Sequence, residues 1–244
     1  MKYIVIVCAC VLVSFTARAD WTGKTEAGLV LATGNTESET ANAKVAFVQE
    51  TGAWKNTVGG AALYTSADEE GTTARRWEAF GQSDYNFSPK TFAFGAGRYE
   101  DDEFSGFEYQ ATLSAGLGRR FIDTDRAKFS GTAGVGYKFF ETSDAFDAET
   151  GELIAPGTSD SEVVFRGTLD FDYAFTATTS LIDRFIVEAG ADNTFVQNDI
   201  SLQVKMTAVL ALAVGYSVRH NTDPPIGFEK TDTLTTINLV YELK

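Results

Sequence analysis

The chain has 244 residues, of which 44% are hydrophobic and 13% aromatic, and its formal net charge is −14. Such a high share of apolar and aromatic residues excludes a low-complexity disordered protein. So acidic a chain also lacks the basic footprint of a protein that binds nucleic acid non-specifically.

Residues 1–19 have the pattern of a cleavable export signal. Lys2 supplies the positive start, residues 3–15 form an apolar run, and Ala17-Arg18-Ala19 gives the small-x-small pattern of a cleavage site. We therefore expect cleavage between Ala19 and Asp20. An N-terminal membrane anchor is the alternative, but the run is shorter than the ~20 residues that span a bilayer. Cleavage would leave 18 basic and 34 acidic residues, a net charge of −16.

Both cysteines, Cys8 and Cys10, lie inside the predicted signal. The mature chain is then expected to have none, which excludes disulfides, thiolate metal sites and cysteine nucleophiles.

The repeating pattern of the mature chain, residues 20–244, has a period of two. Apolar or small residues alternate with polar ones over 107–117, 129–139 and 163–175, with Phe107 opening the apolar set of the first. Such alternation predicts amphipathic strands. These strands are longer than the five or six residues usual in soluble proteins, and they match the ~9–11 that cross a bilayer at a tilt.

Twelve such segments predict one all-β domain, a transmembrane up-and-down antiparallel β-barrel. The predicted strands are 22–32, 39–50, 54–66, 74–87, 91–100, 107–121, 128–142, 162–175, 180–190, 198–207, 210–220 and 232–243.

The predicted connections alternate in length. If the N-terminus is periplasmic, the connections after even-numbered strands are short periplasmic turns, and those after odd-numbered strands are longer extracellular loops. Acidic clusters fall on the longer side, at 68–70, 100–103 and 144–152. The long connections are predicted at 33–38, 67–73, 101–106, 143–161, 191–197 and 221–231.

Aromatic residues gather beside the short turns, as in the interfacial girdle of a membrane barrel. Tyr85 and Phe87 precede one turn, Phe92 and Phe94 follow it, and Phe121 and Phe129 flank the next. Core aromatics of a soluble periplasmic barrel or sandwich are the alternative.

Several short motifs resemble the family of salt-stress-induced outer-membrane proteins of Gram-negative bacteria, a domain family of unknown function. They occur in the family's order and cover nearly the whole mature chain: Thr33-Gly34-Asn35-Thr36-Glu37, Gly116-Leu117-Gly118, Asp123-Thr124-Asp125-Arg126, Gly134-Val135-Gly136-Tyr137, Asp223-Pro224-Pro225, Gly227-Phe228 and Thr231-Asp232-Thr233.

The resemblance implies location more than activity. It implies an outer-membrane protein in contact with lipid and lipopolysaccharide, inserted by the outer-membrane assembly machinery. The chain ends Tyr241-Glu242-Leu243-Lys244, not in the aromatic residue usual for such barrels. The family brings no catalytic residue, metal or cofactor to carry over.

The sequence offers little to a catalytic hypothesis. An outer-membrane hydrolase needs a serine and a histidine placed together, but Ser217 and His220 lie three apart on a strand and should face opposite sides. Asp144, Asp147, Glu149 and Glu152 miss the spacing of a calcium loop and are interpreted as solvated loop charges. We therefore expect no enzyme and no metal or cofactor site.

Ten ionisable residues are predicted to face the barrel interior, where charged groups at membrane depth pair with one another. Two hypotheses follow: a salt-bridged plug in a structural, envelope-stress barrel, or the lining of a narrow channel for small polar solutes. The residues are Arg76, Glu78, Asp84, Glu108, Arg120, Lys128, Lys138, Arg166, Asp170 and Asp172.

Overall fold

The computed structural model describes residues 21–32, 38–67, 71–103, 105–146, 150–226 and 228–243. The predicted export signal with its cleavage site at Ala19 and Asp20 lies outside these ranges, and so do the motif at 33–37, Asp147, Glu149 and Gly227. Among the described residues, no helix is long and apolar enough to cross a membrane.

Twelve antiparallel strands close into a barrel, which confirms the predicted fold class. Around the ring their order is β1-β14-β13-β12-β11-β10-β7-β6-β5-β4-β3-β2. The strands are β1 (Trp21–Ala32), β2 (Ser38–Thr51), β3 (Trp54–Ala67), β4 (Gly71–Asn86), β5 (Thr91–Asp102), β6 (Phe107–Asp123), β7 (Ala127–Thr142), β10 (Ser159–Ala174), β11 (Thr179–Ala189), β12 (Thr194–Lys205), β13 (Leu210–Asn221) and β14 (Thr231–Leu243).

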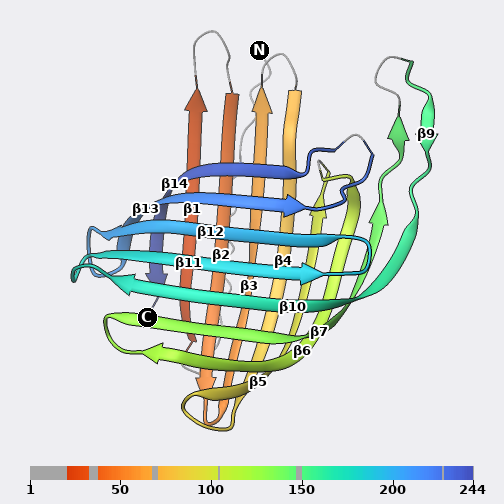
Figure 1. The fold of residues 1–244 in the computed structure, drawn as a ribbon. Coiled ribbons are helices and arrows are strands. Elements are labelled where there is room, and N and C mark those ends of the chain that lie inside the picture. Colours follow the sequence, from red (N-terminus) through yellow and green to blue (C-terminus); the bar gives the residue numbers. More distant parts are fainter. Residues whose placement is uncertain are drawn as a thin grey trace.

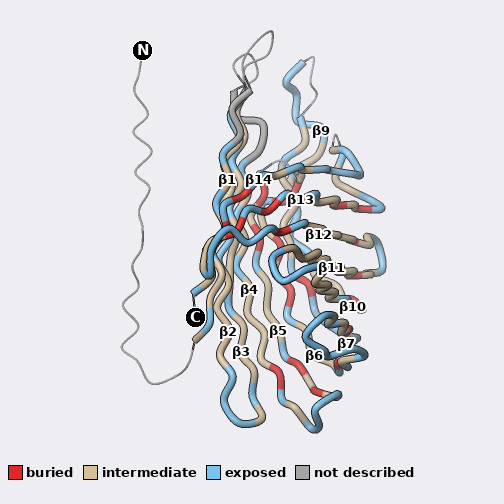
Figure 2. Tube along the Cα trace, turned by 90° about the vertical axis from the view of Figure 1, so that its left-hand side faces the viewer, coloured by how far each residue is buried: buried red, intermediate tan, exposed pale blue. Residues whose placement is uncertain are grey.

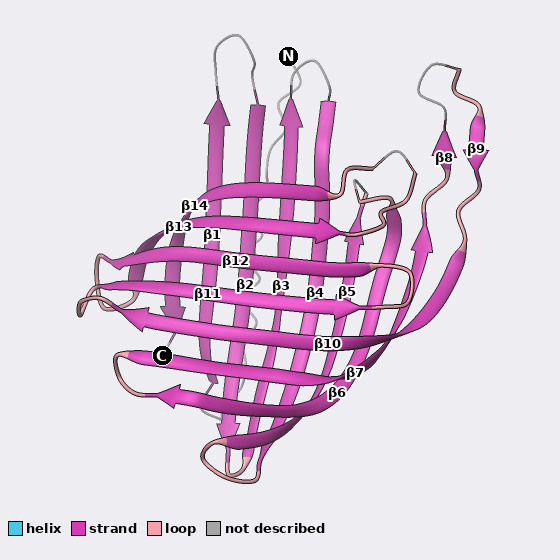
Figure 3. Ribbon diagram, viewed as in Figure 1, coloured by secondary structure: helices cyan, strands magenta, loops and turns pink. Residues whose placement is uncertain are grey.

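The barrel is flattened into two walls whose strands cross. In Figure 1 and Figure 3, β1 to β4 run upright, β10 to β14 run across them, and the strands between bend from one wall into the other. We call the end with the connections β2–β3, β4–β5, β6–β7, β10–β11 and β12–β13 the short-turn end, and the opposite end the long-loop end.

The outward face of the barrel is apolar. Leu113, Val135 and Val163, from three neighbouring strands, are 64%, 64% and 65% exposed. Figure 2 shows the resulting alternation of exposed and less exposed positions along the strands. This is the reverse of a soluble core, and it is the arrangement of a barrel that contacts lipid.

Aromatic side chains form two outward groups. At the short-turn end, Trp54 contacts Tyr85 with ring centroids 5.0 Å apart, and Tyr85 contacts Phe87 at 5.4 Å. At the long-loop end, Trp77 lies 5.1 Å from Tyr99. The apolar band lies between two aromatic groups, as expected where a barrel meets two membrane interfaces.

A β-bulge corrects the predicted phase at the start of β6. The pairing with β7 shifts between Phe107 and Tyr109, so Phe107 turns inward and is only 5% exposed. Phe107 was predicted to face outward with Tyr109. The extra residue, Glu108, is exposed. A bulge changes the phase by one residue, which alternation alone does not reveal.

Several strands reach further than predicted and shorten the connections at the long-loop end. β5 includes Asp101 and Asp102, β12 begins at Thr194, and β10 begins at Ser159. The connections that remain are 33–37, 68–70, 103–106, 143–158, 190–193 and 222–230. The predicted greater length holds for 33–37, 143–158 and 222–230, whereas the other three are no longer than the connections 87–90, 175–178 and 206–209 at the short-turn end. The connection after β7 also carries a small hairpin of β8 (Ala145–Phe146) and β9 (Leu153–Ala155) that was not predicted.

Facing glycines allow close approach between β6 and β7. Gly116 is in register with Gly134, and a Cβ atom on Gly116 would collide with the carbonyl of Ala133 and the Cα atom of Gly134. Neither strand leaves room for a side chain at this position, so glycine is required on both.

Candidate functional site

The site is the barrel interior, where charged side chains from opposite walls meet. Because side chains alternate across a strand, the apolar outward face places the intervening polar residues in the lumen. Eight of the ten predicted residues lie buried or partly buried: Arg76, Glu78, Asp84, Arg120, Lys138, Arg166, Asp170 and Asp172. The other two are exposed: Glu108 stands in the bulge, and Lys128 lies at the mouth of a cavity.

The central contact is an ion pair across the lumen. Arg219 of β13 donates hydrogen bonds to Glu100 and to Asp102 of β5, with 3.0 Å between Arg219 Nη1 and Asp102 Oδ2. β5 and β13 lie six places apart in either direction around the ring, so they are opposite one another. Glu100 is only 1% exposed. This contact, the Arg219 bridge, connects the two walls directly.

Arg98 extends the bridge along β5. Its guanidinium donates to Glu78 at 2.9 Å and to Glu100 at 2.5 Å. The guanidinium carbons of Arg98 and Arg219 lie 5.4 and 5.2 Å from the ring centroid of Phe195, within the range of a cation–π contact. Phe195 thus packs beside both cations and fills space between the walls.

A second group of charges lies under the bend between the walls. Arg166 pairs with Glu188, its partner in register, with 3.4 Å between Nε and Oε1. Thr112 of β6 donates to the other oxygen of Glu188 at 3.3 Å. Lys138 lies over the Phe107 and Phe140 rings, 5.6 and 5.7 Å from their centroids. Together with the Arg219 bridge, this group fills much of the lumen near the long-loop end.

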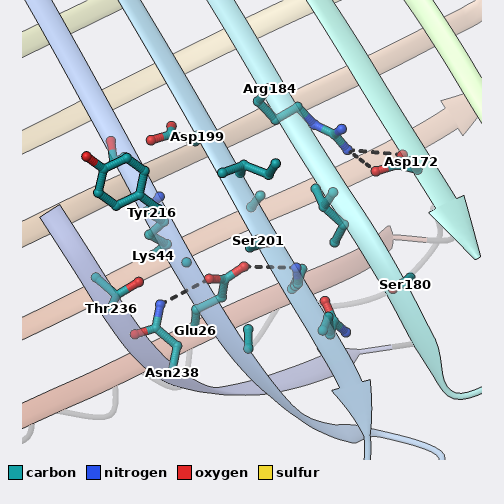
Figure 4. A pocket seen from close by; sticks show the side chains of 18 of the residues that line it. Glu26, Lys44, Asp172, Ser180, Arg184, Asp199, Ser201, Tyr216, Thr236 and Asn238 are labelled. Carbon is teal, nitrogen blue, oxygen red and sulfur yellow. Dashed lines mark hydrogen bonds and ion pairs between the residues drawn. The ribbon is translucent and has the colours of Figure 1, made fainter. Parts of the chain in front are cut away.

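A cavity of about 670 Å³ occupies the half of the lumen near the short-turn end. Figure 4 shows its walls, with Arg184 bonded to Asp172 on one side and Asn238 donating to Glu26 on the other. We call it the short-turn cavity. Its ionic side chains are mostly paired, for example Lys24 with Glu26 at 2.9 Å and Arg184 with Asp170 at 3.1 Å.

A second cavity of about 290 Å³, the long-loop cavity, lies beside the Arg219 bridge. Four residues line both cavities: Leu63, Arg76, Ser217 and Leu234. They mark the boundary between the two spaces. Arg76 has the longest side chain among them, and its Nη1 atom is 4.0 Å from Asp102 Oδ2.

Five residues that complete the charge network were not predicted to face the interior: Arg98, Glu100, Asp102, Glu188 and Arg219. The acids Glu100 and Asp102 were interpreted as part of a solvated extracellular cluster, which is wrong, because both lie buried inside the barrel against Arg219. Phe92 and Phe94 of β5 were predicted in the outward aromatic girdle, which is wrong, because both are 4% exposed and face inward. The same alternation places Arg98, Glu100 and Asp102 inward. The alternation of β11 and of β13 likewise indicates that Glu188 and Arg219 face inward.

The candidate catalytic and metal residues are not brought together. His220 Nδ1 lies 2.8 Å from the hydroxyl of Thr231, whereas Ser217 lines the cavities. Asp144 accepts a hydrogen bond from the backbone N–H of Gly157 at 2.7 Å. Among the described residues, no group of three or more histidine, cysteine, aspartate or glutamate side chains is arranged to hold a metal ion.

This fold and its charged lumen define a β-barrel of the outer-membrane type. The translocator domain of the autotransporter NalP from Neisseria meningitidis is similar, with a TM-score of 0.50 and 12% identity over 92% of this chain and 87% of that one. The NanC porin has a TM-score of 0.51 and 9% identity over 91% of this chain and 99% of the porin. These identities show the fold alone.

The chain belongs to the family described as "Protein of unknown function, DUF481", whose pattern matches residues 25–243. The uncharacterized protein YdiY of Escherichia coli (strain K12) is 26% identical over 231 residues, which is 93% of this chain and 85% of that protein. The prediction of a barrel family of unknown function is confirmed, while the link to salt stress stays a prediction.

Proposed function

We propose that this chain is exported and inserted into the outer membrane, where it serves as a structural, non-enzymatic barrel with a role in envelope stress. The outward apolar band between two aromatic groups supports the membrane placement. Lipid and lipopolysaccharide are its proposed surroundings, and the outer-membrane assembly machinery its proposed route of insertion.

The Arg219 bridge is the observation that carries the structural role. It joins opposite walls with buried ion pairs and obstructs the lumen near the long-loop end. An open pore does not need cross-lumen contacts, whereas a barrel that must keep its shape gains from them because they couple strands that share no backbone pairing.

Planar-bilayer recording of the refolded mature chain tests the proposal. A barrel obstructed by the bridge gives no reproducible open-channel steps, and regular steps of constant size would contradict a purely structural role.

Extraction tests the location: the protein should stay in the outer-membrane fraction until detergent is added. N-terminal sequencing of the isolated protein should begin at Asp20.

A small diffusion channel for polar solutes is the second candidate. The two cavities favour it, because they share four lining residues and together occupy much of the barrel's length. The NanC barrel, which has this fold, is named a porin. In this case the boundary at Arg76 is the narrowest part of the solute's path through the barrel. Conductance steps should then appear in bilayer recordings of the wild-type protein.

A further inference from the structure

The seam that closes the barrel is paired along only part of its length. The register of β1 with β14 runs from Gly23↔Leu243 to Gly28↔Asn238, although β1 continues to Ala32 and β14 begins at Thr231. On their other edges both strands stay paired, β1 with β2 as far as Ala32↔Ser38 and β14 with β13 from His220↔Thr231. β1 and β14 therefore separate toward the long-loop end. In Figure 1 the first part of β14 runs across the upright strands β4 to β1, and the strand then bends downward beside β1.

The paired part of the seam lies within the apolar band, which continues just beyond it at Leu29 of β1 and Ile237 of β14. On β14 the exposed apolar side chains are Ile237, Leu239, Tyr241 and Leu243. Toward the long-loop end, the exposed positions of the same alternation are Thr231, Thr233 and Thr235. Backbone groups inside hydrocarbon must be hydrogen-bonded, whereas those in water need not be. The pairing thus ends close to the level where β14 leaves the lipid, and beyond Ile237 the outward positions of β14 are threonines.

The long-loop cavity lies behind this opening. Its walls include Asp232, Thr233 and Leu234 of β14 on one side and Thr40 and Thr65 of β2 and β3 on the other. The unpaired part of the seam falls between these two sides, because β1 stands between β14 and β2 in the ring.

The lining of the cavity suits a polar, uncharged molecule. Its two cations, Arg76 and Arg219, are matched by two carboxylates, Asp102 and Asp232, so it offers no net charge to an ion. Thr40 donates to Thr65 with 3.3 Å between the hydroxyl oxygens, and both can exchange hydrogen bonds with a ligand's hydroxyl groups. A lipid chain would find apolar side chains only at Leu63 and Leu234.

We propose that the open part of the β1–β14 seam is a side portal through which small, uncharged, hydroxyl-bearing molecules enter the long-loop cavity. Only the height of the portal above the lipid rests on the proposed membrane placement. It is independent of whether the lumen conducts, so a silent bilayer recording leaves it standing.

Paired cysteines test whether the seam is open. Directly opposed residues on antiparallel strands have Cα atoms ~4.5–5.5 Å apart, close enough for a disulfide. Ala27→Cys with Leu239→Cys, a pair in register, should cross-link under mild oxidation in the refolded mature chain. Leu31→Cys with Thr235→Cys occupies the same kind of position four residues further on, and it should stay unlinked. Rapid cross-linking of this second pair would overturn the portal.

A single cysteine tests the class of molecule admitted. Thr40→Cys places a thiol in the long-loop cavity, and Thr235→Cys serves as an exposed control. Each is treated with hydroxyethyl, sulfonatoethyl and trimethylammonioethyl methanethiosulfonate, which are uncharged, anionic and cationic. Relative to the control, the uncharged reagent should react with Thr40→Cys several-fold faster than either ion. Equal rates, a preference for an ion, or protection from all three reagents would overturn the proposal.

Discussion

Arg219 and Glu100 form an ion pair from strands on opposite sides of the barrel, with the carboxylate almost completely buried. The two residues are 119 positions apart in the chain. No backbone pairing connects β5 with β13, so this side-chain contact is a direct tie between the two walls.

We expect Arg219→Met to lower the free energy of unfolding by about 3–5 kcal/mol, because it removes the cross-lumen partner of two buried carboxylates and leaves Arg98 and Arg76 to face an excess of negative charge. Methionine keeps an apolar stem beside Phe195 but removes the charge. Denaturant titration of the refolded protein measures the change. Lys24→Met, at the more exposed pair with Glu26, is the control and should change stability by less than about 1 kcal/mol.

A double variant shows whether the loss comes from the pair itself. Adding Glu100→Gln to Arg219→Met removes the excess negative charge, so the double variant should be more stable than the sum of the single effects predicts. Additive losses would show that the two side chains stabilise the barrel separately.

The alternation of β6, β7 and β10 was sufficient to predict the strands, because each strand separates lipid from lumen and the pattern follows directly. Two features were beyond that argument. The bulge at Glu108 changes the phase without any change in composition. The partners of Arg219 depend on how the ring closes, and closure places together residues that no local pattern relates. The acids of β5 were misplaced because a run of carboxylates is typical of a solvent-exposed loop. Their burial inside the barrel is favourable only because arginines lie opposite them, and the local sequence does not show those arginines.

The close approach of β6 and β7 at Gly116 leaves no room for a side chain at this position. Gly116→Val should lower the free energy of unfolding by about 1–3 kcal/mol, because its Cβ would meet the backbone of β7 and force the strands apart. Gly95→Ala is the matched control on β5, where a Cβ atom meets nothing within 4 Å. Thermal unfolding of both variants in the same detergent is the measurement. Equal shifts in Tm would show that close approach is not the reason for the glycine.

The two aromatic groups predict where the barrel sits in the bilayer. Trp54 and Trp77, kept singly with the other tryptophans replaced by phenylalanine, should be quenched most by lipids brominated near the headgroup. Val135→Trp in a tryptophan-free background should be quenched most by lipids brominated deep in the chain, because this position lies in the apolar band. Fluorescence in vesicles of each lipid gives the depth. Deep quenching of Trp54 or Trp77 would contradict the placement.

Arg76 is the residue whose removal should change conduction most. It lines both cavities and has the longest side chain at their boundary. If the barrel is a channel, Arg76→Ser should therefore join the cavities and produce larger conductance steps in planar bilayers than the wild-type chain. Loss of its positive charge should also move the reversal potential in a salt gradient toward cation selectivity. Arg75→Ser is the matched control. Arg75 is next to Arg76 in the chain, but its side chain is exposed and pairs with Glu103 outside both cavities. A larger conductance in both variants, or in neither, would show that Arg76 does not separate the two spaces, and the channel candidate would then lose the geometry on which it depends.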